Sequence, residues 1–163
     1  MNLEYSNAFS EMNFSKLIED FLGSRSPSSQ LKKFMDSNLT VVDKVLYRGM
    51  PFNKYFIKKG FKIEDWYGFG HWSDDIEIAK GFSKDYVNDE YVEELINEYG
   101  KSNVEFINAI FVIDKLECFP SCEYLSESSA FYKEKEYTTI SSSYLIEDYY
   151  EDNGFYFVNV KQI

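Results

Sequence analysis

The chain has 163 residues, of which 44% are hydrophobic and 19% aromatic, so it is long enough to bury the core of one domain. Its 28 acidic and 17 basic residues give a formal net charge of -11, which argues against a protein that itself binds nucleic acid or an anionic membrane. That charge favours a basic, arginine-bearing protein as partner. The 14 Tyr and 15 Phe favour a sheet-rich fold.

Only two cysteines occur, Cys118 and Cys122, without the further Cys and His ligands that a zinc site needs. We therefore expect two reduced thiols and no metal. Residues 1–5 lack the basic and apolar regions of a signal peptide, and no run of about 18 apolar residues occurs. These features predict a cytoplasmic protein. The bias toward Asn, Lys, Ile, Tyr and Phe is typical of AT-rich genomes and indicates a bacteriophage or a low-GC bacterium as source.

The N-terminal part predicts a helical layer over residues 1–40. Apolar residues at positions 14, 17, 18 and 21 predict a first helix, and residues 30–35 predict a second, short helix with a basic face. A linker rich in Ser, with one Gly and one Pro, spans residues 23–29 and separates them. Residues 41–163 then form the core of the same single domain and carry the candidate catalytic residues.

The first candidate segment is an apolar strand, residues 45–50, that ends in Arg48 and Gly49. A guanidinium offers a planar fork of donors to phosphate oxygens, and a glycine lets the backbone approach a flat ring. Most arginines placed after a strand are surface salt-bridge partners, so this pattern alone does not define a site.

Residues 69–82 predict the end of a strand followed by a short helix. Either Ser73 or Asp74 would cap that helix, and Asp74 with Glu77 has the spacing of a capping box. One apolar face follows, made of Ile78, Ala79 and Phe82. Any fold can contain a serine before an acidic helix start, so the segment gains meaning only from the rest of the chain.

Downstream, residues 89–99 predict an amphipathic helix that Gly100 ends, and residues 104–113 predict a long strand. Residues 123–133 are rich in Ser and lack apolar periodicity, so they predict a loop. This loop leads into the most informative pair of residues in the chain.

Glu134 and Glu136 lie in a segment, residues 133–140, that predicts a strand. Because strand side chains alternate between faces, both carboxylates would point to the same side. Two like charges side by side cost energy and tend to raise the pKa of one carboxyl, which makes the pair a candidate active site. The alternative is an edge strand that carries solvated charge.

The last elements form a predicted hairpin, residues 144–150 and 155–160, around Asp152-Asn153-Gly154, whose Asn-Gly pair is typical of a tight turn. The whole pattern predicts an α+β fold. We expect two packed, mainly antiparallel sheets with flanking helices and the N-terminal helical layer.

Taken together and in this order, Arg48, the segment around Ser73, and Glu134-Lys135-Glu136 resemble the arginine-specific ADP-ribosyltransferases. That family carries an Arg, a Ser-Thr-Ser type motif and a Glu-x-Glu motif, and the resemblance covers residues 45–163. Here His71 stands where the family has the first Ser of its triplet, and Trp72 stands at the middle position. An imidazole can hold the catalytic Glu by donating a hydrogen bond. A packed histidine outside the chemistry, or altered activity, are the alternatives.

The resemblance implies that NAD is the donor of ADP-ribose and that cleavage of the nicotinamide–ribose bond develops positive charge on the sugar. Glu136 would stabilise that charge, and Glu134 would hold the acceptor arginine and accept its proton. The implied NAD-binding residues are Arg48 on a phosphate, Gly49 on the nicotinamide amide, Phe82 on the nicotinamide ring, and His71 with Ser73 as supports of the strand end. For Phe82, a place in the core is the alternative.

We therefore expect a mono-ADP-ribosyltransferase, a toxin-like effector that modifies a target protein. One alternative is an acidic inhibitor that mimics nucleic acid and blocks a basic groove. It requires one continuous stripe of carboxylates, made of Asp89, Glu90, Glu93, Glu94, Glu147, Asp148, Glu151 and Asp152. The other alternative is an NAD glycohydrolase with the same fold, in which water is the acceptor.

Overall fold

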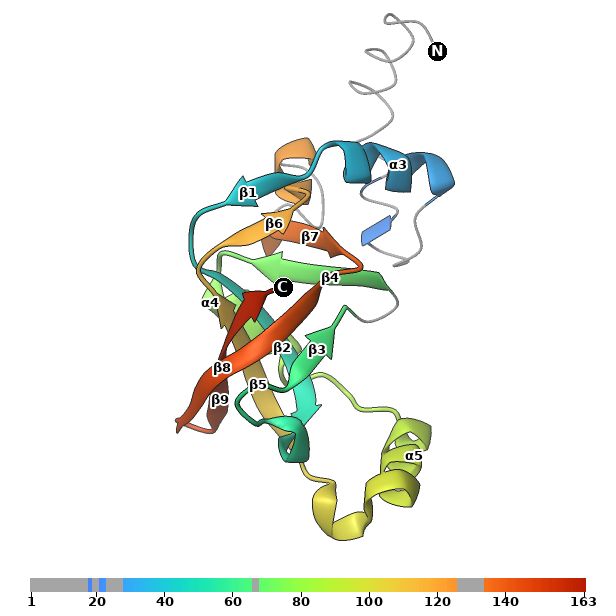
Figure 1. Ribbon diagram of the computed structural model, residues 1–163, viewed down its shortest axis with the longest axis vertical. Coiled ribbons are helices and arrows are strands. Elements are labelled where there is room, and N and C mark those ends of the chain that lie inside the picture. Colours follow the sequence, from blue (N-terminus) through green and yellow to red (C-terminus); the bar gives the residue numbers. More distant parts are fainter. Residues whose placement is uncertain (1–17, 19–20, 23–27, 66–67, 126–133) are drawn as a thin grey trace, which may run out of the picture.

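The computed structural model describes residues 18, 21–22, 28–65, 68–125 and 134–163 (Figure 1). The strands are β1 (Thr40–Val42), β2 (Leu46–Asn53), β3 (Lys62–Glu64), β4 (Phe69–Ser73), β5 (Phe106–Ile113), β6 (Leu116–Cys118), β7 (Glu136–Ile140), β8 (Ser143–Asp152) and β9 (Phe155–Gln162). The helices are α3 (Ser29–Ser37), α4 (Ile76–Phe82) and α5 (Asp89–Tyr99), with 3-10 turns η1 (Lys54–Phe56), η3 (Lys101–Asn103) and η4 (Ser121–Tyr124).

The strands form a seven-stranded sheet of order β3-β8-β9-β5-β2-β4-β7 and a two-stranded sheet, β1-β6. The larger sheet changes direction between β2 and β4, which share one residue pair, Tyr47 with Ser73, and Figure 1 shows β4 and β7 running across β2 and β5. An isolated bridge between Phe119 and Thr138 joins the chain after β6 to β7. The strands therefore make two layers, which we call the long layer (β3-β8-β9-β5-β2) and the short layer (β4-β7 with β6-β1).

The main core lies between these two layers. The short layer contributes Trp72 and Tyr137, and the long layer contributes Leu46, Phe111 and Val158, all of them buried. Burial of such large apolar side chains is the main force that holds the layers together. Only β5 and β9 pair in parallel among the described strands. These features confirm the predicted α+β fold with two packed, mainly antiparallel sheets.

Helices cover the outer faces of both layers. Helix α4 packs through Ala79 against Ile110 and Phe157 of the long layer. On the short layer, Ile18, Phe21 and Leu22 pack with Leu31 and Met35 of α3 around Phe119. The predicted N-terminal helical layer is therefore present in the described residues. The rest of its predicted first helix and most of its linker lie outside them.

The hairpin and the helix at 89–99 form as predicted. Helix α5 spans Asp89–Tyr99 and ends at Gly100, whose φ of 91° lies in the left-handed region that glycine adopts most easily. Strands β8 and β9 turn at Asn153 and Gly154, with φ of 49° and 82°. Positive φ at both residues is the requirement of a type I′ hairpin turn.

The predicted cap of α4 was wrong. The N-cap is Asp75, whose side chain accepts a hydrogen bond from the backbone N–H of Glu77, and not Ser73 or Asp74. Ser73 is the last residue of β4, so the strand holds it outside the helix start. Three consecutive good capping residues gave the sequence no means to select one of them.

Candidate active site

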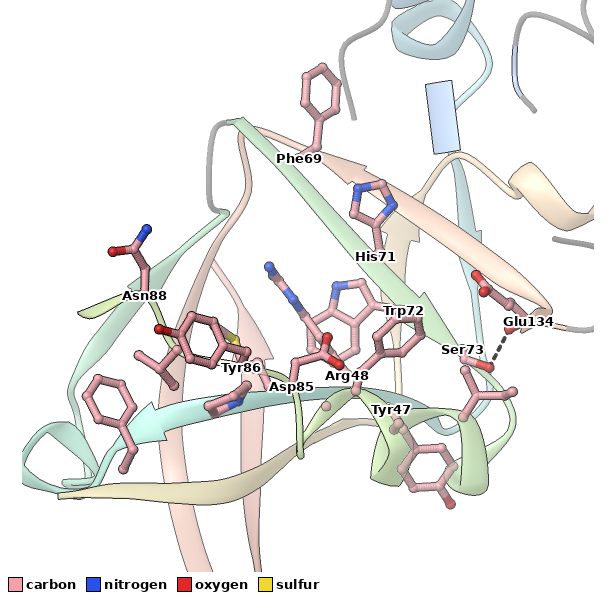
Figure 2. Close-up of a pocket in the computed structure, with 18 of the residues that line it drawn as sticks. Tyr47, Arg48, Phe69, His71, Trp72, Ser73, Asp85, Tyr86, Asn88 and Glu134 are labelled. Carbon is pink, nitrogen blue, oxygen red and sulfur yellow. Dashed lines mark hydrogen bonds between the residues drawn. The ribbon is translucent and has the colours of Figure 1, made fainter. Parts of the chain in front are cut away.

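A cleft of about 780 Å³ lies where β2 and β4 diverge, with α4 and the start of α5 along its side (Figure 2). All seven residues that the sequence assigned to the site line it: Arg48, Gly49, His71, Ser73, Phe82, Glu134 and Glu136. They come from β2, β4, α4, the first residue of β7, and the segment just before β7, which holds Glu134. The two layers of the fold therefore contribute different parts of one cleft.

His71 and Glu136 form the centre of one wall. In the pairing of β4 with β7, Ser73 is opposite Glu136 and His71 is opposite Thr138, so His71 and Glu136 are diagonal neighbours on one face. The His71 Nδ1 atom lies against the Glu136 Oε1 atom. The Glu136 side chain is only 5% exposed, and burial of a carboxylate requires such a polar partner. The predicted contact between His71 and Glu136 is thus present.

The ring of Phe21 packs beside the imidazole of His71. Its centroid lies 5.6 Å from that of His71, and 5.1 Å from that of Phe69. Phe21 of the N-terminal layer therefore contacts two residues that line the cleft. This layer contributes to the environment of the His71–Glu136 pair.

Glu134 reaches the cleft by a different route from the one predicted. Strand β7 begins at Glu136, and Lys135 has φ of 47°, so the alternation of strand side chains does not place Glu134 beside Glu136. A left-handed residue turns the chain sharply and brings both carboxylates to the same cleft. The expectation of a strand over residues 133–140 was wrong at its start, where Glu134 lies outside β7, and Lys133 lies outside the described residues.

Ser73 fixes this turn. Its hydroxyl donates to the backbone carbonyl of Glu134 over 2.7 Å, drawn as the dashed line in Figure 2, and accepts from the backbone N–H of Asp75 over 3.1 Å. One side chain therefore ties the end of β4 to the segment that leads into β7 and to the N-cap of α4. These two bonds place Ser73 at the strand end that it was expected to orient.

Arg48 points into the cleft from β2 and forms an ion pair that the sequence did not predict. Its Nη1 atom donates to Asp65 Oδ1 over 3.3 Å, and the Asp65 side chain is completely buried. Asp65 lies between β3 and β4, and no local motif distinguishes it from the other 27 acidic residues. The sequence around Asp65 therefore carries no signal that marks it as part of the site.

Gly49 has a packing role in addition to its place in the cleft. A Cβ atom added there would lie 1.6 Å from the carbonyl oxygen of Ala79, a distance that no real structure allows. Glycine at this position lets α4 approach β2 closely. Phe82, at the end of the same helix, lines the cleft and is half-buried.

The far end of the cleft carries residues that the sequence analysis did not single out for the site. Tyr86 and Asn88 lie there, on the opposite side of the view from Glu134 in Figure 2. Five carboxylates line the cleft, namely Asp85, Glu90, Glu94, Glu134 and Glu136, and Arg48 is the lining residue that carries a permanent positive charge. The carboxylates favour a cationic group in the cleft, and Arg48 can bind an anionic group beside it.

The acidic residues of the inhibitor alternative do not form one stripe. Four of them belong to α5, where Glu90 and Glu94 line the cleft itself. The other four belong to the end of β8, which lies on the opposite side of the molecule from α5 in Figure 1. The continuous acidic surface that this alternative requires is therefore divided into two separate groups.

The described residues contain no group of three or more His, Cys, Asp or Glu side chains placed to hold a metal ion. Within the same ranges, no helix is long and apolar enough to cross a membrane. Cys118 and Cys122 are both free thiols, as predicted.

No model of a protein family matches the chain, and no curated protein sequence matches it. Several solved structures are similar to this one. The ADP-ribosyltransferase Vis in complex with the M6 inhibitor has 14% identity and a TM-score of 0.58, over 95% of this chain and 69% of that one. Vis in complex with agmatine has 15% identity and a TM-score of 0.55, over 96% and 71%. The Vis toxin from Vibrio splendidus has 14% identity and a TM-score of 0.51, over 95% of this chain and 69% of that one. The chain therefore has the ADP-ribosyltransferase fold.

Proposed function

We propose that this protein is an ADP-ribosyltransferase that moves ADP-ribose from NAD to an arginine side chain of a target protein. The observation that carries the proposal is the buried Glu136 carboxylate, held by His71 in one cleft with Glu134 and Arg48. The volume of the cleft, about 780 Å³, falls within the range of roughly 300–1,000 Å³ that is typical of small-molecule sites.

In this proposal NAD lies along the cleft with its pyrophosphate at Arg48. A guanidinium makes charge-assisted hydrogen bonds to phosphate oxygens, and Arg48 is the lining residue with a permanent positive charge. Phe82 offers its half-buried ring to the nicotinamide, and the backbone at Gly49 offers hydrogen-bonding groups to the nicotinamide amide. The nicotinamide ribose then lies toward Glu136.

The reaction starts with cleavage of the bond between the nicotinamide nitrogen and the ribose. The bond's electron pair leaves with nicotinamide, which becomes neutral, and the sugar gains positive charge. The Glu136 carboxylate, fixed by His71, stabilises this charge more in the transition state than in the ground state. A nitrogen of the acceptor guanidinium then bonds to the sugar carbon, and its proton passes to Glu134.

The choice of arginine as acceptor rests on Glu134 and on the charge of the cleft. The Ser73 hydrogen bond holds the backbone of Glu134 just before β7. A carboxylate can bind a guanidinium through two parallel hydrogen bonds. The five carboxylates that line the cleft favour a cationic acceptor. Agmatine, the compound in one of the similar Vis structures, is a small guanidinium compound and a convenient test acceptor.

The experiment incubates the protein with NAD labelled in its adenosine part and with one of three acceptors: agmatine, an arginine-rich protein, or a lysine-rich protein. We expect label on agmatine and on the arginine-rich protein, with nicotinamide released in equal amount. Label on the lysine-rich protein alone would contradict the choice of arginine. Release of free ADP-ribose with all three acceptors would identify an NAD glycohydrolase. Unchanged NAD would contradict both enzymatic functions.

A further inference from the structure

A buried carboxylate behind Arg48 has no part in the proposed chemistry and makes an unusual number of contacts. Asp65 Oδ1 accepts from Arg48 Nη1 over 3.3 Å and from the Tyr144 hydroxyl over 2.8 Å. Its Oδ2 accepts from the Thr139 hydroxyl over 2.8 Å and from the Ser142 backbone N–H over 3.0 Å. Both oxygens are thus satisfied in a side chain with no exposed surface.

The surroundings hold Asp65 from several elements at once. Its backbone N–H donates to the Ser142 carbonyl over 2.9 Å, so backbone and side chain are both tied to the turn between β7 and β8. Strand β4 passes close by at Gly70, where an added Cβ would lie 2.3 Å from Asp65 Oδ1. Trp72 Nε1 donates to the Tyr144 hydroxyl over 3.3 Å. The carboxylate therefore has little freedom to move.

Tyr144 is a hydrogen-bond donor to this carboxylate. Burial, and after it the charge of Asp65, raises the pKa of the Tyr144 hydroxyl far above its usual value. The hydroxyl therefore stays protonated throughout the physiological range and donates to Asp65. Asp65 is thus held by two hydroxyl donors and a backbone donor, independently of Arg48.

Arg48 depends on Asp65 more than Asp65 depends on Arg48. The guanidinium has five N–H donors, and Asp65 is its only hydrogen-bond acceptor among the described residues. Its side chain is 14% exposed and lines the cleft. An ion pair with a buried, fixed carboxylate restricts the conformations of the Arg48 side chain. The side chain then loses less conformational entropy when its remaining donors bind a ligand.

We propose that Asp65 is a positioning residue that fixes the Arg48 guanidinium for a phosphate of the dinucleotide, with Tyr144, Thr139 and Ser142 holding Asp65 in turn. The proposal rests on the proposed function for the identity of the ligand. It assigns to Asp65 no contact with the substrate. Removal of its charge should therefore affect the binding of NAD through Arg48 and through no other residue of the cleft.

The first test needs no ligand. The sequence contains two arginines, Arg25 and Arg48, so the spectrum of arginine Nε–Hε groups in a ¹⁵N-labelled sample contains two signals, and Arg48→Lys assigns them. We expect slow solvent exchange and hindered guanidinium rotation for Arg48 in the wild type. Both should approach the values of free arginine in Asp65→Asn. A freely rotating Arg48 in the wild type, or an unchanged signal in the variant, would overturn the proposal.

The second test measures NAD affinity by calorimetry and steady-state kinetics. Asp65→Asn keeps the size of the side chain and removes its charge, so we expect the Kd and KM for NAD to rise about tenfold while kcat changes less than threefold. Tyr144→Phe removes one hydrogen bond to Asp65 and should give a smaller change in the same direction. In an Arg48→Ala background, Asp65→Asn should have no further effect, because Asp65 acts through Arg48.

Asn53→Ala is the matched control. Asn53 is buried on the same strand as Arg48, bonds to Asn103 and Glu105, and lies outside the cleft. It should lower stability and leave the Kd for NAD unchanged. If Asp65→Asn binds NAD like the wild type while Arg48→Ala binds it weakly, the positioning role is wrong and the proposed function stands. A wild type that binds no NAD would overturn the function and the phosphate role together, while the NMR signal still decides whether Asp65 orders Arg48.

Discussion

Glu136 is the residue on which the proposed chemistry depends, and its surroundings explain how the fold keeps a carboxylate there. The side chain is almost completely buried, at the start of β7, with His71 as its neighbour on β4. A buried carboxylate without a polar partner is strongly destabilising. His71 lies against this carboxylate and is the polar neighbour that the structure shows for it.

This arrangement predicts how His71 variants behave. His71→Ala leaves Glu136 without this partner, so we expect the rate of nicotinamide release from NAD to fall about tenfold or more, which corresponds to about 1.4 kcal/mol of transition-state stabilisation. His71→Ser provides a hydroxyl donor and should retain more activity than His71→Ala. A His71→Ala protein with wild-type activity and stability would show that the histidine only fills space.

At the scale of the elements, the contact between β2 and α4 depends on a single glycine. The chain needs α4 close to β2, because Ala79 packs under the long layer while Phe82 lines the cleft. Gly49 permits this approach, since the carbonyl of Ala79 occupies the space of a side chain.

Two glycine substitutions test this contact against each other. Gly49→Ala forces backbone atoms apart, so we expect a loss of about 1–3 kcal/mol in the free energy of unfolding and weaker NAD binding. Gly81→Ala, within α4, meets no atom within 4 Å and should be neutral or stabilise by about 0.5–1 kcal/mol. Urea unfolding measures both variants. Equal stability of the two would contradict the close approach.

The elements that the sequence predicted best are those with a strong local signal. Helix α5 ends at Gly100, and the β8–β9 hairpin turns at Asn153-Gly154. All three residues have a positive φ, which Gly and Asn adopt more easily than other residues. The prediction of where β7 starts was wrong because a local signal is missing there. Lys135 adopts a left-handed φ although lysine has no preference for it, so tertiary contacts decide its conformation and the sequence carries no sign of it.

The site shows the same division. The sequence selected seven residues by their types and their order along the chain, and all seven line one cleft. Asp65 could not be predicted, because its importance comes from being surrounded by β2, β4, β7 and β8 at once. Such a role depends on the arrangement of distant segments and on no local pattern.

At the scale of the whole molecule, the cleft lies at the junction of the two layers. The long layer provides Arg48 and the short layer provides His71 and Glu136, while one residue pair joins the layers at this point. The geometry of the site therefore depends on the core between the layers. Destabilising that core should disturb Arg48 relative to Glu136 before it disturbs either strand.

The thiols report on the integrity of this core. Burial raises the pKa of the Cys118 thiol to about 12 and also raises that of Cys122. Because the thiolate is the reactive form, both cysteines should react slowly with a thiol reagent at pH 8 in the native protein, and both should react fully after unfolding in denaturant. Fast reaction of either thiol in the native state would contradict the packing of the core.

Nicotinamide release from NAD, compared between the wild type, Glu136→Gln and Glu134→Gln with and without agmatine, tests the central claim most directly. We predict that Glu136→Gln lowers the rates of both hydrolysis and transfer by on the order of a hundredfold or more, because the Glu136 carboxylate supplies the negative charge that stabilises the transition state. Glu134→Gln should keep measurable nicotinamide release and lose transfer to agmatine. Equal loss of hydrolysis in both variants would contradict the separate roles of the two carboxylates. Unchanged activity in both would contradict the active site itself.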